Sequence, residues 1–236
     1  MRSIMLFILS FSIFILLSGC LYPDERRPEN QVPYEDQIQS VQSAVIQFRQ
    51  DHGRLPIIER ENTDVFRKYQ VNFAPLIPNY LQSPPGNSFE SGGVFQYVLI
   101  NIEEMPEVKL IHLPMIREIQ EFQQRVDMYR RENQYAPVDQ IVGKELLRLD
   151  YEELNYSEQP TVDSPYHPDH RLPLLLQNDG TVIIDYTIDI LYFIEEHGLD
   201  EFDEGDDLRW LLVKHAPFVP VYSRPMTLID GEIVFN

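Results

Sequence analysis

The chain has 236 residues, with 19 Lys and Arg against 38 Asp and Glu, so its formal net charge is −19 at pH 7. Nucleic-acid binding depends largely on Lys and Arg that neutralise phosphates, and this balance therefore argues against nucleic acid as a partner. The one cysteine in the sequence, Cys20, allows no disulfide within the chain. The length suits one large domain or two small ones.

The amino terminus has the three parts of a secretory signal. A positively charged start precedes an apolar run at 4–17, and two small residues then precede Cys20. The run of 14 residues is shorter than the roughly 20 that a membrane-spanning helix needs. We therefore predict a cleaved signal peptide over residues 1–19 rather than an uncleaved membrane helix.

The four residues Leu17-Ser18-Gly19-Cys20 resemble the lipobox of bacterial prolipoproteins. The resemblance implies a diacylglyceryl group on the sulfur of Cys20, cleavage before it and an N-acyl group on the new terminus. Two or more acyl chains give stable anchoring, whereas one gives only marginal binding. The expected location is the outer face of the cytoplasmic membrane, with the charged, proline-containing residues 20–32 as a lipidated tether.

Two segments that lie 81 positions apart are similar to each other. Residues 38–57 and 119–138 share six identities in twenty positions, which predicts a duplicated unit, although two unrelated amphipathic helices are the alternative. We predict unit 1 at 33–113 and unit 2 at 114–187. The identical pairs are Ile38/Ile119, Gln39/Gln120, Gln42/Gln123, Val45/Val126, Arg49/Arg130 and Pro56/Pro137.

Each unit is predicted to be a long amphipathic helix, an irregular proline-rich connection and a β-hairpin. Apolar residues recur at helical spacing in both segments, and Gly53 suits a left-handed C-terminal cap. The hairpins are expected at 93–113 and at 172–186, where Asn178-Asp179-Gly180 predicts a tight turn in the second. The predicted fold class is α+β, with each helix packed on a small antiparallel sheet. The matched glutamines Gln39, Gln42, Gln120 and Gln123 are interpreted as a solvated face rather than as ligand contacts.

The helix endings FRQDHGRLP and YRRENQYAP resemble the soluble domains of pseudopilins, in which a similar aromatic, charged and Pro pattern precedes an antiparallel sheet. This resemblance implies a shape only. The chain has no prepilin peptidase site and no long hydrophobic helix leading into the soluble one, so fibre assembly is not implied.

Residues 188–236 are predicted to form a helical and β extension. A helix is expected at 188–197, capped by Gly198, with Ile188, Leu191 and Ile194 on one face. Further elements are a helix over 208–215 with Asp206 or Asp207 as its N-cap and Trp210 buried, a strand at 219–222, and a hairpin over 226–235 that turns at Asp230-Gly231.

Two clusters are candidate metal sites. Residues 195–207 hold eight carboxylates, among which Asp203, Asp206 and Asp207 are candidate calcium ligands. The loop fails the EF-hand pattern, and a solvated acidic loop is the favoured interpretation. His167 and His170, with Asp163 nearby, offer zinc-ligand types in a loop stiffened by prolines.

Signals of catalysis are missing from the sequence: it has no G-x-S-x-G, no H-E-x-x-H and no phosphate-binding glycine loop. We therefore predict a protein that is not an enzyme and has no cofactor apart from its lipid. A Ser-His-Asp triad drawn from distant residues stays open, because triads are defined by geometry.

The segments LYPDERRPENQVPYEDQIQSVQSAV and DLRWLLVKHAPFVPVYS resemble a family of uncharacterised lipoproteins from spore-forming Gram-positive bacteria, some of which are described as extracytoplasmic binding components of ABC transporters. Three functions follow as hypotheses. The first is a non-enzymatic binding or scaffold module whose partner is an envelope protein or a wall component. The second is a solute-binding component of an ABC transporter, and the third is an envelope hydrolase.

Overall fold

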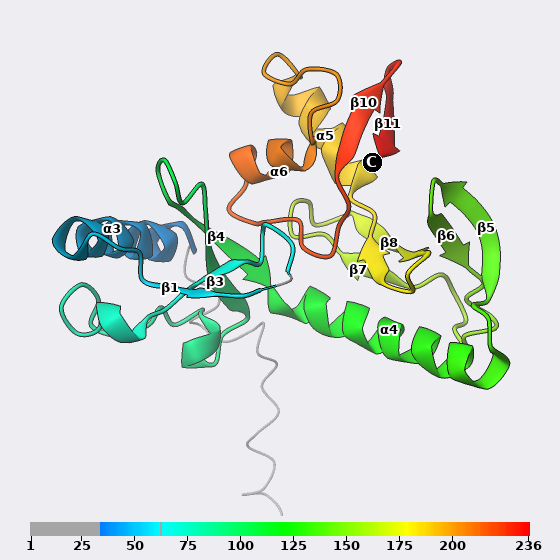
Figure 1. Cartoon of the computed structure of the whole chain (residues 1–236), viewed down its shortest axis with the longest axis horizontal. Coiled ribbons are helices and arrows are strands. Elements are labelled where there is room, and N and C mark those ends of the chain that lie inside the picture. The colour runs from blue at the N-terminus through cyan, green and yellow to red at the C-terminus, as the bar shows by residue number, and fades with distance from the viewer. Residues whose placement is uncertain (1–33, 62) are drawn as a thin grey trace, which may run out of the picture.

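The computed structural model describes residues 34–61 and 63–236 (Figure 1). The predicted signal peptide, Cys20 and most of the tether lie outside these residues, as does Pro33. Within the described part, no helix is both long enough and apolar enough to cross a membrane. The described chain is mixed α+β, as predicted, and all of its strand ladders are antiparallel.

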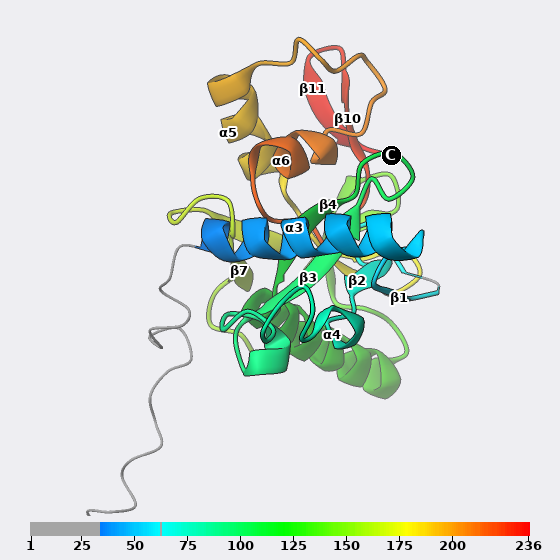
Figure 2. The same ribbon diagram turned by 90° about the vertical axis from the view of Figure 1, so that its left-hand side faces the viewer.

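Unit 1 places one long helix against one sheet. The helix α3 packs on strand β4 through apolar residues that include Val41, Val45 and Phe48, each at most 2% exposed. Figure 2 shows α3 lying across the sheet, whose strands run in the order β1-β2-β3-β4. The elements are α3 (Tyr34–His52), β1 (Ile57–Glu59), β2 (Tyr69–Val71), β3 (Phe95–Ile100) and β4 (Glu107–His112).

Unit 2 repeats this order of elements: a long helix, a hairpin, a connection and a second hairpin. Its sheet has the order β5-β6-β8-β7, and β9 also pairs with β8, so the two hairpins meet through β6 and β8 as they meet through β2 and β3 in unit 1. The elements are α4 (Leu113–Asn133), β5 (Val138–Gly143), β6 (Leu146–Leu149), β7 (Thr161–Asp163), β8 (Arg171–Gln177) and β9 (Val182–Ile184).

The connections are more regular than the predicted irregular segments. They contain the hairpins β1–β2 and β5–β6 and the strand β7, none of which was expected. These strands have three to six residues, and β5 is exposed at four of its six positions. Strands so short, or so little buried, lack the alternation of apolar and polar residues that identifies a strand in a sequence.

The two long helices end in the same way. Gly53 has φ +65° and Gln134 has φ +68°, and each donates its backbone N–H to the carbonyl four residues earlier, on Arg49 and Arg130, at 2.9 Å. The predicted cap at Gly53 is therefore confirmed. The second unit uses a glutamine in the same left-handed conformation, which glycine adopts more easily.

The interpretation of all four matched glutamines as a solvated face is wrong for two of them. Gln42 Nε2 donates to the carbonyl of Pro106 at 2.7 Å, and its Oε1 accepts from Val108 N at 2.7 Å. Gln123 Nε2 donates to the carbonyl of Gly180 at 2.9 Å, and its Oε1 accepts from Val182 N at 2.7 Å. Both side chains therefore join a helix to its hairpin, while Gln39 and Gln120 are exposed.

The carboxyl-terminal extension lies over both units (Figure 1). The predicted strand at 219–222 does not form. This segment instead runs between the two sheets, with a parallel bridge between Leu110 and Phe218 on one side and a bond from Ile184 N to the carbonyl of Tyr222 at 2.7 Å on the other. Its regular elements are α5 (Thr187–His197), α6 (Arg209–His215), β10 (Met226–Ile229) and β11 (Glu232–Phe235).

The β10–β11 hairpin turns at Asp230 and Gly231, both with positive φ, as predicted. Trp210 is half-buried rather than fully buried, and its ring lies 5.1 Å from that of Phe66 in unit 1. Because an indole is large and Trp210 stands at the start of α6, part of it stays in contact with solvent.

The face of α5 that carries Ile188, Leu191 and Ile194 packs against the core only at Ile194, which is half-buried. Ile188 and Leu191 are 42% and 50% exposed, whereas Asp189, Ile190 and Phe193 are buried. The helix carries apolar residues on two faces, and the position of α6 decides which face is packed. Spacing alone could not distinguish them.

Candidate functional site

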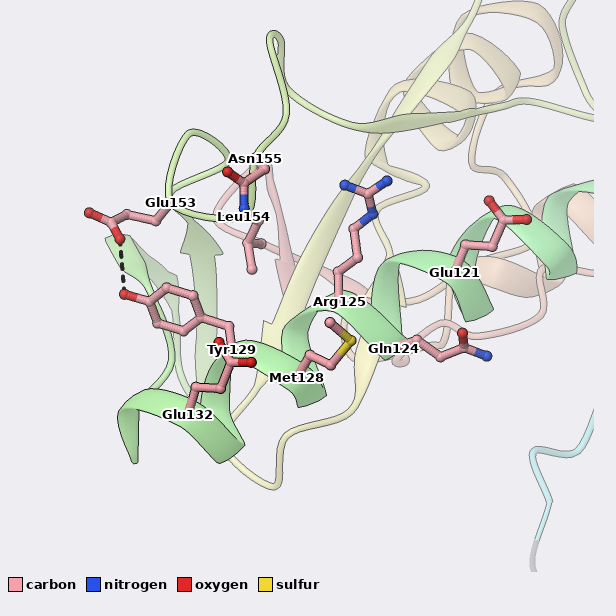
Figure 3. Close-up of a pocket in the computed structure, with 9 residues that line it drawn as sticks. All are labelled: Glu121, Gln124, Arg125, Met128, Tyr129, Glu132, Glu153, Leu154 and Asn155. Atoms are coloured by element: carbon pink, nitrogen blue, oxygen red, sulfur yellow. Dashed lines mark hydrogen bonds between the residues drawn. The ribbon is translucent and has the colours of Figure 1, made fainter.

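A shallow groove of about 400 Å³ runs along α4, between the helix and the loop 150–156 (Figure 3). Most of its lining residues are exposed, which makes it an open surface feature rather than an enclosed cavity. The helix contributes Glu121, Gln124, Arg125, Met128, Tyr129 and Glu132, and the loop contributes Glu153, Leu154 and Asn155.

The orientation of α4 follows from its apolar stripe. Met115, Ile119, Phe122 and Val126 recur at helical spacing and are at most 3% exposed, so this face packs against the sheet. The opposite face is left to solvent along the whole helix. Met128 lies outside the packed stripe and is 54% exposed, which places an apolar side chain in the groove.

The loop wall is held in place by hydrogen bonds. The carboxylate of Asp150 accepts from the backbone N–H groups of Glu152 and Glu153 at 3.0 and 3.3 Å. Leu154 is 3% exposed and anchors the loop in the core, and the Tyr129 hydroxyl donates to Glu153 Oε2 at 3.0 Å. The pKa of Tyr129 is raised well above its ordinary value, first by the hydrogen bond with Tyr135, then by desolvation and Glu153. Its hydroxyl therefore remains a neutral donor.

The charge of the groove is mainly negative. Glu121, Glu132 and Glu153 contribute three carboxylates against the single guanidinium of Arg125, which lies 4.5 Å from the ring of Tyr156. A second hollow, of about 800 Å³, shares Glu121 with the groove and adds Glu118, Glu158 and Arg171. The guanidinium of Arg171 is ion-paired with Asp163. A polar rim of carboxylates thus surrounds the apolar floor.

The groove was not predicted. One signal for it exists in the sequence: Met128 is an apolar residue on the otherwise polar side of an amphipathic helix. The second wall has no such signal, because loop 150–156 reaches α4 only through the tertiary fold.

The candidate calcium ligands do not converge. Asp203 and Asp206 are exposed, and Asp206 Oδ2 accepts from the backbone N–H of Asp203 at 2.9 Å. Asp207 instead binds the guanidinium of Arg209 at 2.7 Å. Its Oδ1 also accepts from Arg209 N at 3.1 Å, but the N-cap of α6 is Leu208 rather than the predicted Asp206 or Asp207.

The candidate zinc ligands stack on each other. The rings of His167 and His170 lie 4.1 Å apart, and the Nδ1 of His170 bonds Asp189 Oδ1 at 2.7 Å. The Nδ1 of His167 accepts from Asp169 N at 3.2 Å. Across residues 34–61 and 63–236, no group of three or more His, Cys, Asp or Glu side chains is placed to hold a metal ion.

The residue types of a catalytic triad occur together in Ser164, Asp189 and His170, but their hydrogen bonds differ from those of a triad. The Ser164 hydroxyl donates to Asp189 Oδ2 at 2.8 Å, so it is bonded to the acid rather than to the imidazole that would activate it. Asp189 is fully buried, and desolvation raises its pKa while the bond from His170 lowers it. These contacts attach the loop 164–170 to α5.

The described chain is thus an α+β protein of two helix-and-sheet units joined by a carboxyl-terminal extension. Residues 34–112, from α3 to β4, match the family model of the YphF family N-terminal domain. Residues 34–112 are therefore similar to that domain. No curated protein and no solved structure matches the chain.

Proposed function

We propose that this protein is a lipid-anchored, non-enzymatic binding or scaffold module on the outer face of the cytoplasmic membrane, and that its partner, an envelope protein or a wall component, binds the groove on α4. The observation that carries the proposal is Met128, which is 54% exposed on the floor of an open groove. Apolar side chains exposed in a concave surface with a polar rim are typical of interaction sites.

The two other hypotheses have less support. Receptors of ABC transporters usually have two α/β lobes with parallel sheets, whereas the described ladders of this chain are antiparallel. A hydrolase needs a nucleophile bonded to its base, and Ser164 instead bonds Asp189. A shallow groove is better suited to a macromolecular partner.

The anchor is proposed from the lipobox-like residues that end at Cys20. The similarity of residues 34–112 to a YphF family N-terminal domain is consistent with the proposed kinship to lipoproteins of spore-forming bacteria. We further propose that units 1 and 2 arose by duplication. The common order of their elements, the paired hydrogen bonds of Gln42 and Gln123, and the left-handed helix ends at Gly53 and Gln134 support this origin.

A photocrosslinking residue at position 128 of the full chain, in cells that produce the protein, tests the binding site. We expect one dominant adduct from position 128 and none from position 89, because Phe89 is similarly exposed (59%) but lies on unit 1. Equal adducts at both positions, or no adduct at position 128, would contradict the proposed site.

The anchor is tested separately through the substitution Cys20→Ala. After growth with labelled palmitate, the unchanged protein should carry label and partition with the membrane, while the variant should do neither. A variant that remains labelled would refute lipidation at Cys20. A variant that is unlabelled yet stays in the membrane would refute the lipid as the anchor.

A further inference from the structure

We infer that the groove on α4 binds a basic amphipathic peptide segment of its partner, with an apolar side chain on Met128 and Lys or Arg side chains on the rim. The inference rests on the proposed function, because it names the chemistry of the partner at that same site. Three features of the described residues support it: the floor, the rim, and the corresponding surface of unit 1.

The floor accepts an apolar anchor. Met128 is 54% exposed, and the ring of Tyr129 and the buried Leu154 lie beside it in the groove. A methionine side chain is flexible and polarizable, so it adapts to ligand side chains of different shape. The floor alone would accept any apolar group, and the rim therefore decides which partner fits.

The rim selects for positive charge. Neither Glu121 nor Glu132 has an ion pair with any residue in the described part of the chain, and Glu153 is bonded by the neutral Tyr129 hydroxyl. The one cation in the groove, Arg125, lies against the ring of Tyr156. Carboxylates without cationic partners around a concave surface attract a cationic segment and disfavour an anionic one.

The same side of the helix in unit 1 is covered by the chain only in part, since Ser40 and Gln47, which align with Glu121 and Met128, are exposed. Ala44, which aligns with Arg125, is 2% exposed, and the connection after β2 contacts α3 and adds Leu76, at 0% exposure, to the same core cluster. Within this connection the Tyr80 hydroxyl donates to Asp51 Oδ2 at 2.7 Å, and Asp51 aligns with Glu132. Unit 1 thus has an apolar anchor and a donor to the carboxylate.

In unit 2 the corresponding loop forms only one wall and Arg125 stays exposed, unlike Ala44, whereas Glu132 is exposed as Asp51 is. A peptide segment that supplies an apolar anchor and donors would cover unit 2 at Arg125, as the chain covers Ala44 in unit 1. Glu132 lines the same groove as Glu121 and Glu153. Cationic donors therefore suit this site better than a neutral phenol such as that of Tyr80 in unit 1.

The test uses the full chain in phosphatidylcholine nanodiscs, which present no net charge to a basic probe. The probe is a fluorescent 18-residue peptide of Leu and Lys with leucines at helical spacing, and a second peptide carries Glu in place of Lys. The double variant Glu121→Lys/Glu132→Lys is compared with Glu195→Lys/Glu196→Lys, which changes exposed carboxylates outside the groove by the same net charge. Met128→Ser tests the floor, and empty nanodiscs are the blank.

We expect saturable binding of the Lys peptide, weakened at least tenfold by Glu121→Lys/Glu132→Lys and severalfold by Met128→Ser, and unchanged by Glu195→Lys/Glu196→Lys. Equal weakening by both double variants would overturn the inference, since it would show attraction to the net charge only. Tighter binding of the Glu peptide, absence of saturable binding, or a dimer of the chain disrupted by the groove variant would also overturn it. A position-128 adduct with an acidic or uncharged partner segment would refute this inference while leaving the proposed function standing.

Discussion

Gln42 and Gln123 form the same pair of hydrogen bonds although they lie 81 positions apart. Each side-chain amide donates to a carbonyl at a hairpin turn and accepts from the N–H two residues later, at Pro106 and Val108 in unit 1 and at Gly180 and Val182 in unit 2. Any amphipathic helix shows apolar periodicity, whereas a matched pair of bonds to the backbone does not follow from periodicity. This relationship is therefore the strongest support for the proposed duplication.

The first prediction concerns these two glutamines. Gln42→Leu and Gln123→Leu should each lower the free energy of unfolding by about 1–3 kcal/mol, because each leaves a half-buried N–H and a carbonyl without a partner. Urea unfolding of the full chain measures the change. The exposed neighbours provide matched controls: Gln39→Leu and Gln120→Leu should change the free energy by no more than about 0.5 kcal/mol. Equal losses of stability at all four positions would show that the hydrogen bonds of Gln42 and Gln123 do not cause the effect.

The second prediction concerns Arg209, which joins unit 1 to the extension. Its side chain is buried and binds Asp207 at 2.7 Å, Asp64 at 3.3 Å and the hydroxyl of Ser223 at 3.0 Å. The guanidinium also lies 5.0 Å from the ring centre of Phe66. Removal of one partner from a buried ionic network leaves the other charges uncompensated.

Arg209→Met should therefore lower the free energy of unfolding by about 3–5 kcal/mol. Arg209→Lys should recover little of this loss, because an ammonium cannot reproduce the planar set of donors. Chemical denaturation with limited proteolysis measures both effects, and the extension should become the first region to be cleaved. Arg117→Met is the control, since Arg117 is exposed on α4. Full recovery by the lysine variant would show that only charge is needed.

The long elements of this fold were predictable because local patterns determine them. The helices α3 and α4 follow from apolar residues at helical spacing, and the β10–β11 turn follows from Asp230-Gly231. The hairpins β1–β2 and β5–β6 and the strand β7 were missed, since these strands are short or little buried and carry too little pattern. The roles of Gln42 and Gln123 also could not be predicted, because a glutamine on a helix surface looks the same whether it faces solvent or a neighbouring backbone.

The candidate sites also show that local sequence patterns do not predict contacts made by the tertiary fold. Residues adjacent in sequence, such as Asp206 and Asp207, were grouped as ligands, yet the fold turns Asp207 toward Arg209. Asp189 was overlooked although it binds His170, which is 19 positions away. The groove combines α4 with a loop that follows two further strands. Sites built across elements need the tertiary arrangement, which no local pattern contains.

The third prediction concerns His215, whose ring stacks on that of His197 at 3.8 Å. Desolvation lowers the pKa of His215 below its ordinary 6.5, and the positive charges of His197, Lys214 and Lys109 lower it further, while Glu201 raises it. Just below pH 6.5 the unfolded chain therefore binds more protons at this residue than the folded chain does. This contribution to stability is present above that range and is lost as the pH falls through it.

An NMR titration of the His215 ring protons should give a midpoint below 6.5. In His197→Gln the midpoint should rise, though not completely, since desolvation is the larger cause. The loss of stability between pH 7 and pH 5 should also become smaller in this variant. A midpoint that the substitution leaves unchanged would contradict an electrostatic coupling between the stacked rings.

The last prediction uses the two apolar faces of α5 as a comparison within one helix. Ile190 is 0% and Phe193 is 6% exposed, so Ile190→Ala and Phe193→Ala should lower the free energy of unfolding by about 2–5 kcal/mol through the cavities that they leave. Ile188→Gln and Leu191→Gln change side chains that are 42% and 50% exposed, and each should stay within about 0.5 kcal/mol of the unchanged protein. If the face that carries Ile188 and Leu191 were the packed one, the glutamine variants would be the destabilised pair. Thermal and urea unfolding of the four variants therefore decide which face of α5 packs against the rest of the protein.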